Sequence, residues 1–115
     1  MQYVMFVVVD PEGEPYVAAD DDYARWDADL EERGVMLDKR RLRPADEATT
    51  VRVRGGELVV TDGPFTESKE WIAGFAVLDC ADLDEAIAIA RTHAMARFGR
   101  IELRPLAQAN GEPLA

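Results

Sequence analysis

The sequence contains a single cysteine and a single histidine, and it lacks any long hydrophobic run. Cys80 therefore cannot form an internal disulfide, and Cys80 and His93 together are too few for a His/Cys metal site. Cys80 lies in an apolar, strand-like segment, which favours a buried, inert thiol. No apolar stretch approaches the roughly 18 residues of a membrane span, and the N-terminus MQYVMFVVVD lacks the basic start of a signal peptide. These features predict a soluble, cytoplasmic protein.

Positive charge is also scarce, since 13 Lys and Arg stand against 23 Asp and Glu, for a net charge of −10. Nucleic-acid surfaces need clustered cations, so this balance argues against such a partner. The one dense basic run is Lys39-Arg40-Arg41, with Arg43 close by. It has two interpretations, a charged strand edge that blocks unwanted pairing and an anion-binding patch.

Sequence motifs for nucleotide, metal and nucleophile chemistry are missing. There is no Walker A, GxGxxG, GxSxG or HExxH motif and no EF-hand loop, so no cofactor is predicted. A length of 115 residues with 48% hydrophobic and 31% charged residues is typical of one globular domain. We expect this domain over residues 1–106, followed by a polar C-terminal tail at 107–115.

The first third of the chain predicts a strand and a helix. The continuous apolar run QYVMFVVV, residues 2–9, is typical of a central strand buried on both faces. In ADDDYARWDADLEERG, residues 19–34, Asp20 to Asp22 fall in the expected first turn, where the helix dipole favours anions, and Gly34 marks the end. The expected apolar stripe consists of Ala19, Tyr23, Trp26 and Leu30.

The rest of the chain predicts a hairpin, a strand, a second helix and a final strand. Gly55-Gly56 forms the expected hairpin tip, pairing residues 50–54 with 57–61. The run WIAGFAVLDC, residues 71–80, predicts the next strand. Asp82 is the expected helix cap, with Glu85 completing a capping box. The predicted stripe of this helix is Leu83, Ala86, Ile87, Ala90 and Ala94, and residues 101–105 predict the last strand.

This order is β-α-β, a hairpin, then β-α-β, and it favours an α+β fold of ferredoxin-like type. We expect one antiparallel sheet with two helices on one face and the β-hairpin as an insertion. The other face is apolar in both central strands. The sequence therefore predicts a homodimer through the open sheet face.

The segment TDGPFTESKEWIAGF, residues 61–75, is longer than a connection between two strands requires. Asp62, Gly63 and Pro64 have turn chemistry, and Phe65 could fill a pocket or pack on a partner subunit. One interpretation is a rigid corner capped by Asp62. The other is a stiff pocket wall, with Asp62 pointing into the pocket.

The two aromatic or titratable candidates on the helices each have two interpretations. His93 falls at the border of the apolar stripe of its helix, where it is either a structural residue or a group for proton transfer. Tyr23 falls on the stripe of the first helix, where it either packs in the core or forms a functional hydrogen bond.

The stretch VRVRGGELVVTDGPFTESKEWIAGF closely resembles the DGPF signature of the YCII-related family, and further similarity, in YVMFVVVD, DLDEAIAIA and GRIELRPL, extends it over residues 2–106. The resemblance implies a dimeric α+β barrel of ferredoxin-like fold. Most members have no established activity, and some are encoded beside, or fused to, extracytoplasmic-function sigma factors. One branch has a His on the first helix and an Asp after the second, proposed as an acid-base pair. Tyr23 and His93 occupy those positions here, and Ala94 follows where many relatives have Pro.

Two functional hypotheses follow. The first is a small dimeric module that binds a small molecule or partner in a cleft beside the DGPF loop, with a regulatory link to a sigma factor implied by the resemblance. The second is a cofactor-independent isomerase, lyase or hydrolase in which His93 and Asp62 transfer protons. We expect the cleft between the hairpin, the first helix and His93. The predicted ligand-binding residues are Tyr23, Gly63, Pro64, Phe65 and Lys69.

Overall fold

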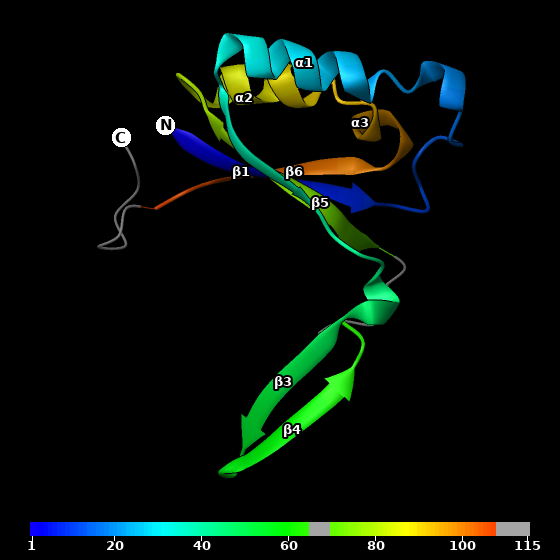
Figure 1. Ribbon diagram of the computed structural model, residues 1–115, viewed down its shortest axis with the longest axis vertical. Helices are drawn as coiled ribbons and strands as arrows, with labels where there is room; N and C mark the ends of the chain where they lie inside the picture. The colour runs from blue at the N-terminus through cyan, green and yellow to red at the C-terminus, as the bar shows by residue number, and fades with distance from the viewer. Residues whose placement is uncertain (65–69, 108–115) are drawn as a thin grey trace.

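A computed structural model describes residues 1–64 and 70–107 of the protein. Four antiparallel strands form one open sheet in the order β2-β5-β1-β6. The strands are β1 (Gln2–Val9), β2 (Met36–Arg41), β5 (Trp71–Asp79) and β6 (Arg100–Pro105). The helices α1 (Tyr23–Arg33), α2 (Leu83–Ala90) and α3 (Met95–Phe98) lie on one face of this sheet (Figure 1). The predicted α+β class, with an antiparallel sheet and helices on one face, is confirmed, and the sheet of the single chain is not a closed barrel.

The core lies between the helices and the two central strands. Tyr3 and Met5 of β1 stand opposite Leu78 and Ala76 of β5, and all four side chains are buried. Trp26 and Leu30 of α1 pack against the same cluster from the helix side of the sheet. Because side chains alternate between the faces of a strand, one face of β1 and β5 meets the helices. Cys80 is buried beside this cluster, and burial raises the pKa of its thiol, as expected for an inert cysteine.

The opposite face of the sheet carries a second apolar row. Val4 stands opposite Val77, and Phe6 stands opposite Phe75. All four are half-buried, and the three helices lie on the other side (Figure 1). The prediction of β1 as a central strand is confirmed, but within a single chain it is not buried on both faces, because helices cover only one of them.

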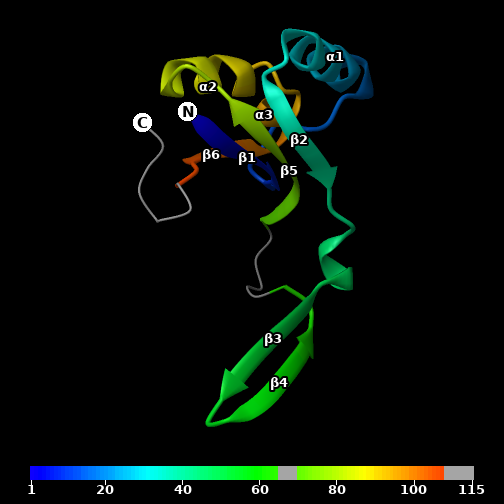
Figure 2. The ribbon, with the colours of Figure 1, turned by 60° about the vertical axis from the view of Figure 1, so that its left-hand side comes forward.

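An inserted hairpin extends from the sheet on the side away from the helices (Figures 1 and 2). It pairs β3 (Thr49–Arg54) with β4 (Glu57–Asp62), and Arg54 faces Glu57 across the turn. Gly55 and Gly56 have φ angles of 58° and 79°, which only glycine adopts readily. The predicted tip is therefore confirmed. One face of the hairpin is an exposed apolar strip made of Val51, Val53, Leu58 and Val60.

Helix α1 begins later than the sequence predicted. Asp20 belongs to a short 3-10 turn, η1 (Ala18–Asp20), and Asp22 is the residue before the helix, so the first turn holds no acid. The placement of Asp20 to Asp22 inside the helix was wrong because an Asp21 carboxylate oxygen accepts the Tyr23 N–H from outside it. Gly34 ends the helix at φ 68°, as predicted.

Helix α2 starts where predicted but presents a different face. Asp82 accepts the Glu85 N–H at 2.9 Å, and the Glu85 carboxylate accepts the Ala81 N–H at 3.4 Å. The predicted stripe was wrong at Leu83 and Ile87, which are 49% and 48% exposed. The buried residues are Ala86, Ile89 and Ala90. The buried Trp26 indole N–H donates to the carbonyl of Ile89 at 3.0 Å, which holds this side of α2 against α1.

A second 3-10 turn, η2 (Ala45–Glu47), leads from β2 into the hairpin. Strand β2 is an edge strand, so the run Lys39-Arg40-Arg41 lies at a sheet edge, in line with the first of its two interpretations. None of the helices within residues 1–64 and 70–107 has the length and apolar character needed to cross a bilayer.

Candidate functional site

A cavity of about 780 Å³ lies where α1 and the start of α3 meet the sheet. This volume is within the roughly 300–1,000 Å³ range of small-molecule pockets. Its apolar walls come from β1, α1 and β5 and include Met5, Val7 and Ala76. Both tryptophans of the chain, Trp26 and Trp71, also line it. Its polar lining consists of Tyr16, Asp21, Tyr23, Lys39, Arg40, Arg41 and His93.

His93 lies in the turn between α2 and α3 and is only 6% exposed. The sequence placed it at the border of core and solvent, but Trp26 and Tyr23 cover it. Their ring centroids lie 4.7 and 5.4 Å from the imidazole, both edge-on. The helix end turns inward here because α2 stops at Ala90, so a single helical wheel through residue 93 misplaces the side chain.

One hydrogen bond sets the tautomer of His93. The backbone N–H of Met95 donates to Nδ1 at 2.9 Å, so Nδ1 carries a lone pair and the neutral ring holds its proton on Nε2. A second proton would have to occupy Nδ1 and displace this bond. Burial lowers the pKa of His93, against smaller opposing contributions from Asp21 and Asp22. The geometry and the electrostatics therefore both favour a neutral imidazole with an Nε2–H donor.

Asp21 is the anionic group of the cavity. Its Oδ2 accepts the Tyr16 hydroxyl at 2.6 Å, and its Oδ1 accepts the Tyr23 N–H at 3.1 Å. The Tyr16 bond first, and the Tyr23 bond second, lower the pKa of Asp21, while the charges of His93 and Arg41 contribute less. The Tyr16 hydroxyl has a raised pKa for the same reason. Asp21 is thus a stabilised carboxylate whose two oxygens are both engaged.

Tyr23 was predicted on the core stripe, but it is the first residue of α1 and is 40% exposed. The core-packing interpretation is therefore wrong. Its ring stacks on Trp26 at 5.9 Å and covers the edge of His93. Tyr23 forms part of the cavity rim and holds His93 in place.

The start of the DGPF segment forms a corner held by backbone bonds. Gly63 has φ 107°, its N–H donates to Ala48 at 2.7 Å, and its carbonyl accepts the Thr50 hydroxyl at 2.7 Å. Pro64 lines a second cavity of about 630 Å³. This second cavity shares Leu42, Pro44 and Trp71 with the His93 cavity, so the two are neighbours.

The predicted site residues thus fall into separate groups. Tyr23 and His93 share the large cavity, and Pro64 borders the adjacent one. Asp62 is exposed, pairs with Thr49 at the base of the hairpin and lines neither cavity. The structure does not bring Asp62 and His93 together in either cavity, and their joint acid-base role stays a prediction. Phe65 and Lys69 lie outside the described residues.

Sequence reasoning missed Tyr16, Asp21, Arg41 and Trp71 as cavity residues. Asp21 was assigned to the first turn of a helix, where the helix dipole explains a negative charge without any functional site. Tyr16 lies in an irregular segment without periodicity, so its contact with Asp21 had no sequence signal. Trp71 was interpreted only as a strand residue, and Arg41 belonged to a run interpreted as either a charged strand edge or an anion-binding patch.

The fold and the cavity define a small α+β domain with a histidine-lined cavity between helices and sheet. Residues 1–110 match the YCII-related domain family, and the chain belongs to that family. It is also similar to an uncharacterized protein of Rhizobium meliloti (strain 1021), with 46% identity over 78 residues. The aligned part covers 66% of this chain and 63% of that relative, so the chain spans less than two thirds of the relative's length.

Proposed function

We propose that the protein binds a small molecule in the His93 cavity, with the His93 Nε2–H as a fixed hydrogen-bond donor. The observation that carries the proposal is the Met95 N–H bond to Nδ1, which gives the buried ring one protonation state and one direction. A few placed polar groups in an apolar pocket are typical of ligand sites. A neutral histidine that donates from beside a helix start can polarise or hold a ligand oxygen without exchanging protons.

The same geometry favours binding over proton transfer. A general base needs a free lone pair and a pKa near the working pH. The Nδ1 lone pair of His93 is occupied by the Met95 N–H, and Nε2 carries a proton. The lowered pKa of Asp21 makes its carboxylate a weak base. His93 and Asp21 are therefore each held in a single state at neutral pH.

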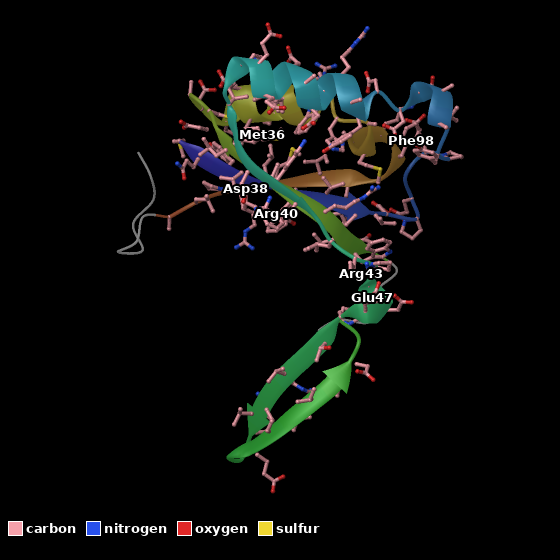
Figure 3. The ribbon with its side chains drawn as sticks, in the orientation of Figure 1. Met36, Asp38, Arg40, Arg43, Glu47 and Phe98 are labelled. Atoms are coloured by element: carbon pink, nitrogen blue, oxygen red, sulfur yellow. The ribbon has the colours of Figure 1, made fainter. Side chains whose placement is uncertain are left out.

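The dimer belongs to the same proposal. The strand order β2-β5-β1-β6, with helices on one face, supports a ferredoxin-like fold whose open face pairs with a second copy. The apolar centre of that face, Val4, Phe6, Phe75 and Val77, is bordered by charges of both signs. Asp38 and Arg40 of β2 flank it on one edge (Figure 3), and Glu102 and Arg104 of β6 flank it on the other. Mixed rims of this kind suit a self-complementary contact.

The DGPF segment has a supporting place in this proposal. Its Pro64 borders the cavity that adjoins the His93 cavity. The backbone hydrogen bonds of Gly63 hold the start of this segment in place. A stiff wall lowers the entropic cost of binding. A regulatory link to a sigma factor remains a prediction from the family resemblance.

A thermal-shift screen against metabolites tests the proposal. A ligand at 100 times its dissociation constant adds about 2.7 kcal/mol to the free energy of unfolding. Ala73→Phe places a ring in the cavity and is expected to abolish the shift. Ala28→Phe makes the same change on the exposed side of α1 and is expected to keep it. A stabilising ligand that acts equally on both variants would place binding elsewhere.

A further inference from the structure

Four cations lie in or just after β2, and three of them form ion pairs with neighbouring carboxylates. Lys39 pairs with Asp27, Arg40 pairs with Asp38 at 3.1 Å, and Arg43 pairs with Glu47 at 2.8 Å. These contacts neutralise three of the four cations. The side chain of Arg41 makes no ion pair or hydrogen bond within the described ranges 1–64 and 70–107, yet Arg41 lines the His93 cavity.

The strand register explains why Arg41 faces the cavity. Arg41 stands opposite Gly74, and Lys39 stands opposite Ala76, a residue buried on the helix side. Because side chains alternate, Arg40 lies on the other side of the sheet with Asp38 (Figure 3). The strand therefore places Lys39 and Arg41 on the helix face. Arg40 also borders the cavity, but its guanidinium is paired with Asp38.

We infer that the ligand of this cavity is a monoanionic organic acid with an apolar body. This inference rests on the proposed binding function and names the ligand class. The guanidinium of Arg41 matches a carboxylate in geometry and charge. The walls formed by Met5, Trp26 and Trp71 suit an aromatic or aliphatic body. The Nε2–H of His93 is a second donor for a ligand oxygen.

Asp21 restricts the charge of the proposed ligand. Its carboxylate faces the same cavity, and its pKa reflects the charge of Arg41. A dianion such as a phosphate monoester would be attracted by Arg41 and repelled by Asp21 about twice as strongly as a carboxylate, because both Coulomb energies scale with charge. One guanidinium neutralises one negative charge, so the second charge of a dianion would remain unpaired near Asp21. A single negative charge at Arg41, at a distance from Asp21, is the arrangement with the least repulsion.

A matched pair of probes tests this inference. 1-Naphthaleneacetate and 1-naphthaleneacetamide have the same shape and differ in charge. Binding is measured by calorimetry and by the fluorescence of Trp26 and Trp71, which both line the cavity. We expect the acid to bind about ten-fold tighter than the amide, the range of one charge-assisted hydrogen-bonded contact. Arg41→Gln should remove this difference, and Arg52→Gln, on the hairpin and outside both cavities, should preserve it.

The outcomes distinguish the anionic ligand class from the proposed binding function. If acid and amide bind the native protein equally, the anion class is overturned while the cavity remains a binding site. If Arg41→Gln keeps the preference for the acid, Arg41 is not the anion contact and the inference fails. If neither probe binds at millimolar concentration, the anion class and the proposed binding function both fail.

Discussion

Replacing Phe75 with Asp tests the proposed dimer most severely. Phe75 stands opposite Phe6 at the centre of the open face, and both are half-buried in the single chain. In a two-fold dimer the substitution is present twice. An unpaired buried charge costs about 3 kcal/mol or more, so two of them weaken association by about 6 kcal/mol, or roughly 10⁴-fold.

Light scattering coupled to size-exclusion chromatography measures this change. The native chain is expected to be a dimer at micromolar concentration, and Phe75→Asp a folded monomer. Ile87→Asp is the matched control, because Ile87 is an exposed apolar residue of α2 on the helix side. Val77→Asp provides a second variant of the open face if Phe75→Asp lowers the yield of folded protein. A monomeric native chain, or dimers in both Phe75→Asp and Ile87→Asp, would refute the reasoning.

Four smaller changes test other parts of the structure. Gly56→Val places a β-branched residue at φ 79° and should speed amide exchange in β3 and β4 by destabilising the hairpin by about 1–2 kcal/mol; unchanged exchange would contradict the turn. Asp82→Ala removes the acceptor of the Glu85 N–H and should cost about 1 kcal/mol in chemical denaturation. Because the folded pKa of His93 lies below its unfolded value of about 6.5, its contribution to stability is complete above that pH and is lost as pH falls below it; His93→Gln should remove this part of the acid sensitivity. Asp62→Asn should leave probe affinity unchanged, since Asp62 lines neither cavity, and weaker binding would return Asp62 to the site.

The sequence predicted the elements whose signals are local. The hairpin tip at Gly55-Gly56 and the cap at Asp82 depend on residues within one turn, and both are present. The apolar run of β1 was enough to place that strand at the centre of the sheet. These features depend on backbone conformation and strand alternation, which neighbouring residues determine.

The cavity could not be predicted in the same way because its parts meet only after folding. Tyr16 and Asp21 precede α1, Arg41 ends β2, and His93 follows α2. Their positions depend on where α2 ends and on which face of α2 is buried. The helical wheel drawn through Leu83 and Ile87 predicted the wrong buried face. The family signature drew attention to Asp62, whereas the described cavity gathers around His93. Long-range packing, rather than any motif, brings these groups together.

The protonation state of His93 tests the central claim most directly, and the chain's only histidine makes the measurement unambiguous. Long-range ¹H–¹⁵N spectra distinguish the two neutral tautomers from the imidazolium as pH varies. The account predicts a neutral ring protonated on Nε2 at neutral pH, a pKa below the ordinary value, and a shift of the Nε2 resonance alone when 1-naphthaleneacetate binds. A ring protonated on Nδ1, or a pKa above the ordinary value, would contradict the fixed-donor site and favour acid-base chemistry at His93.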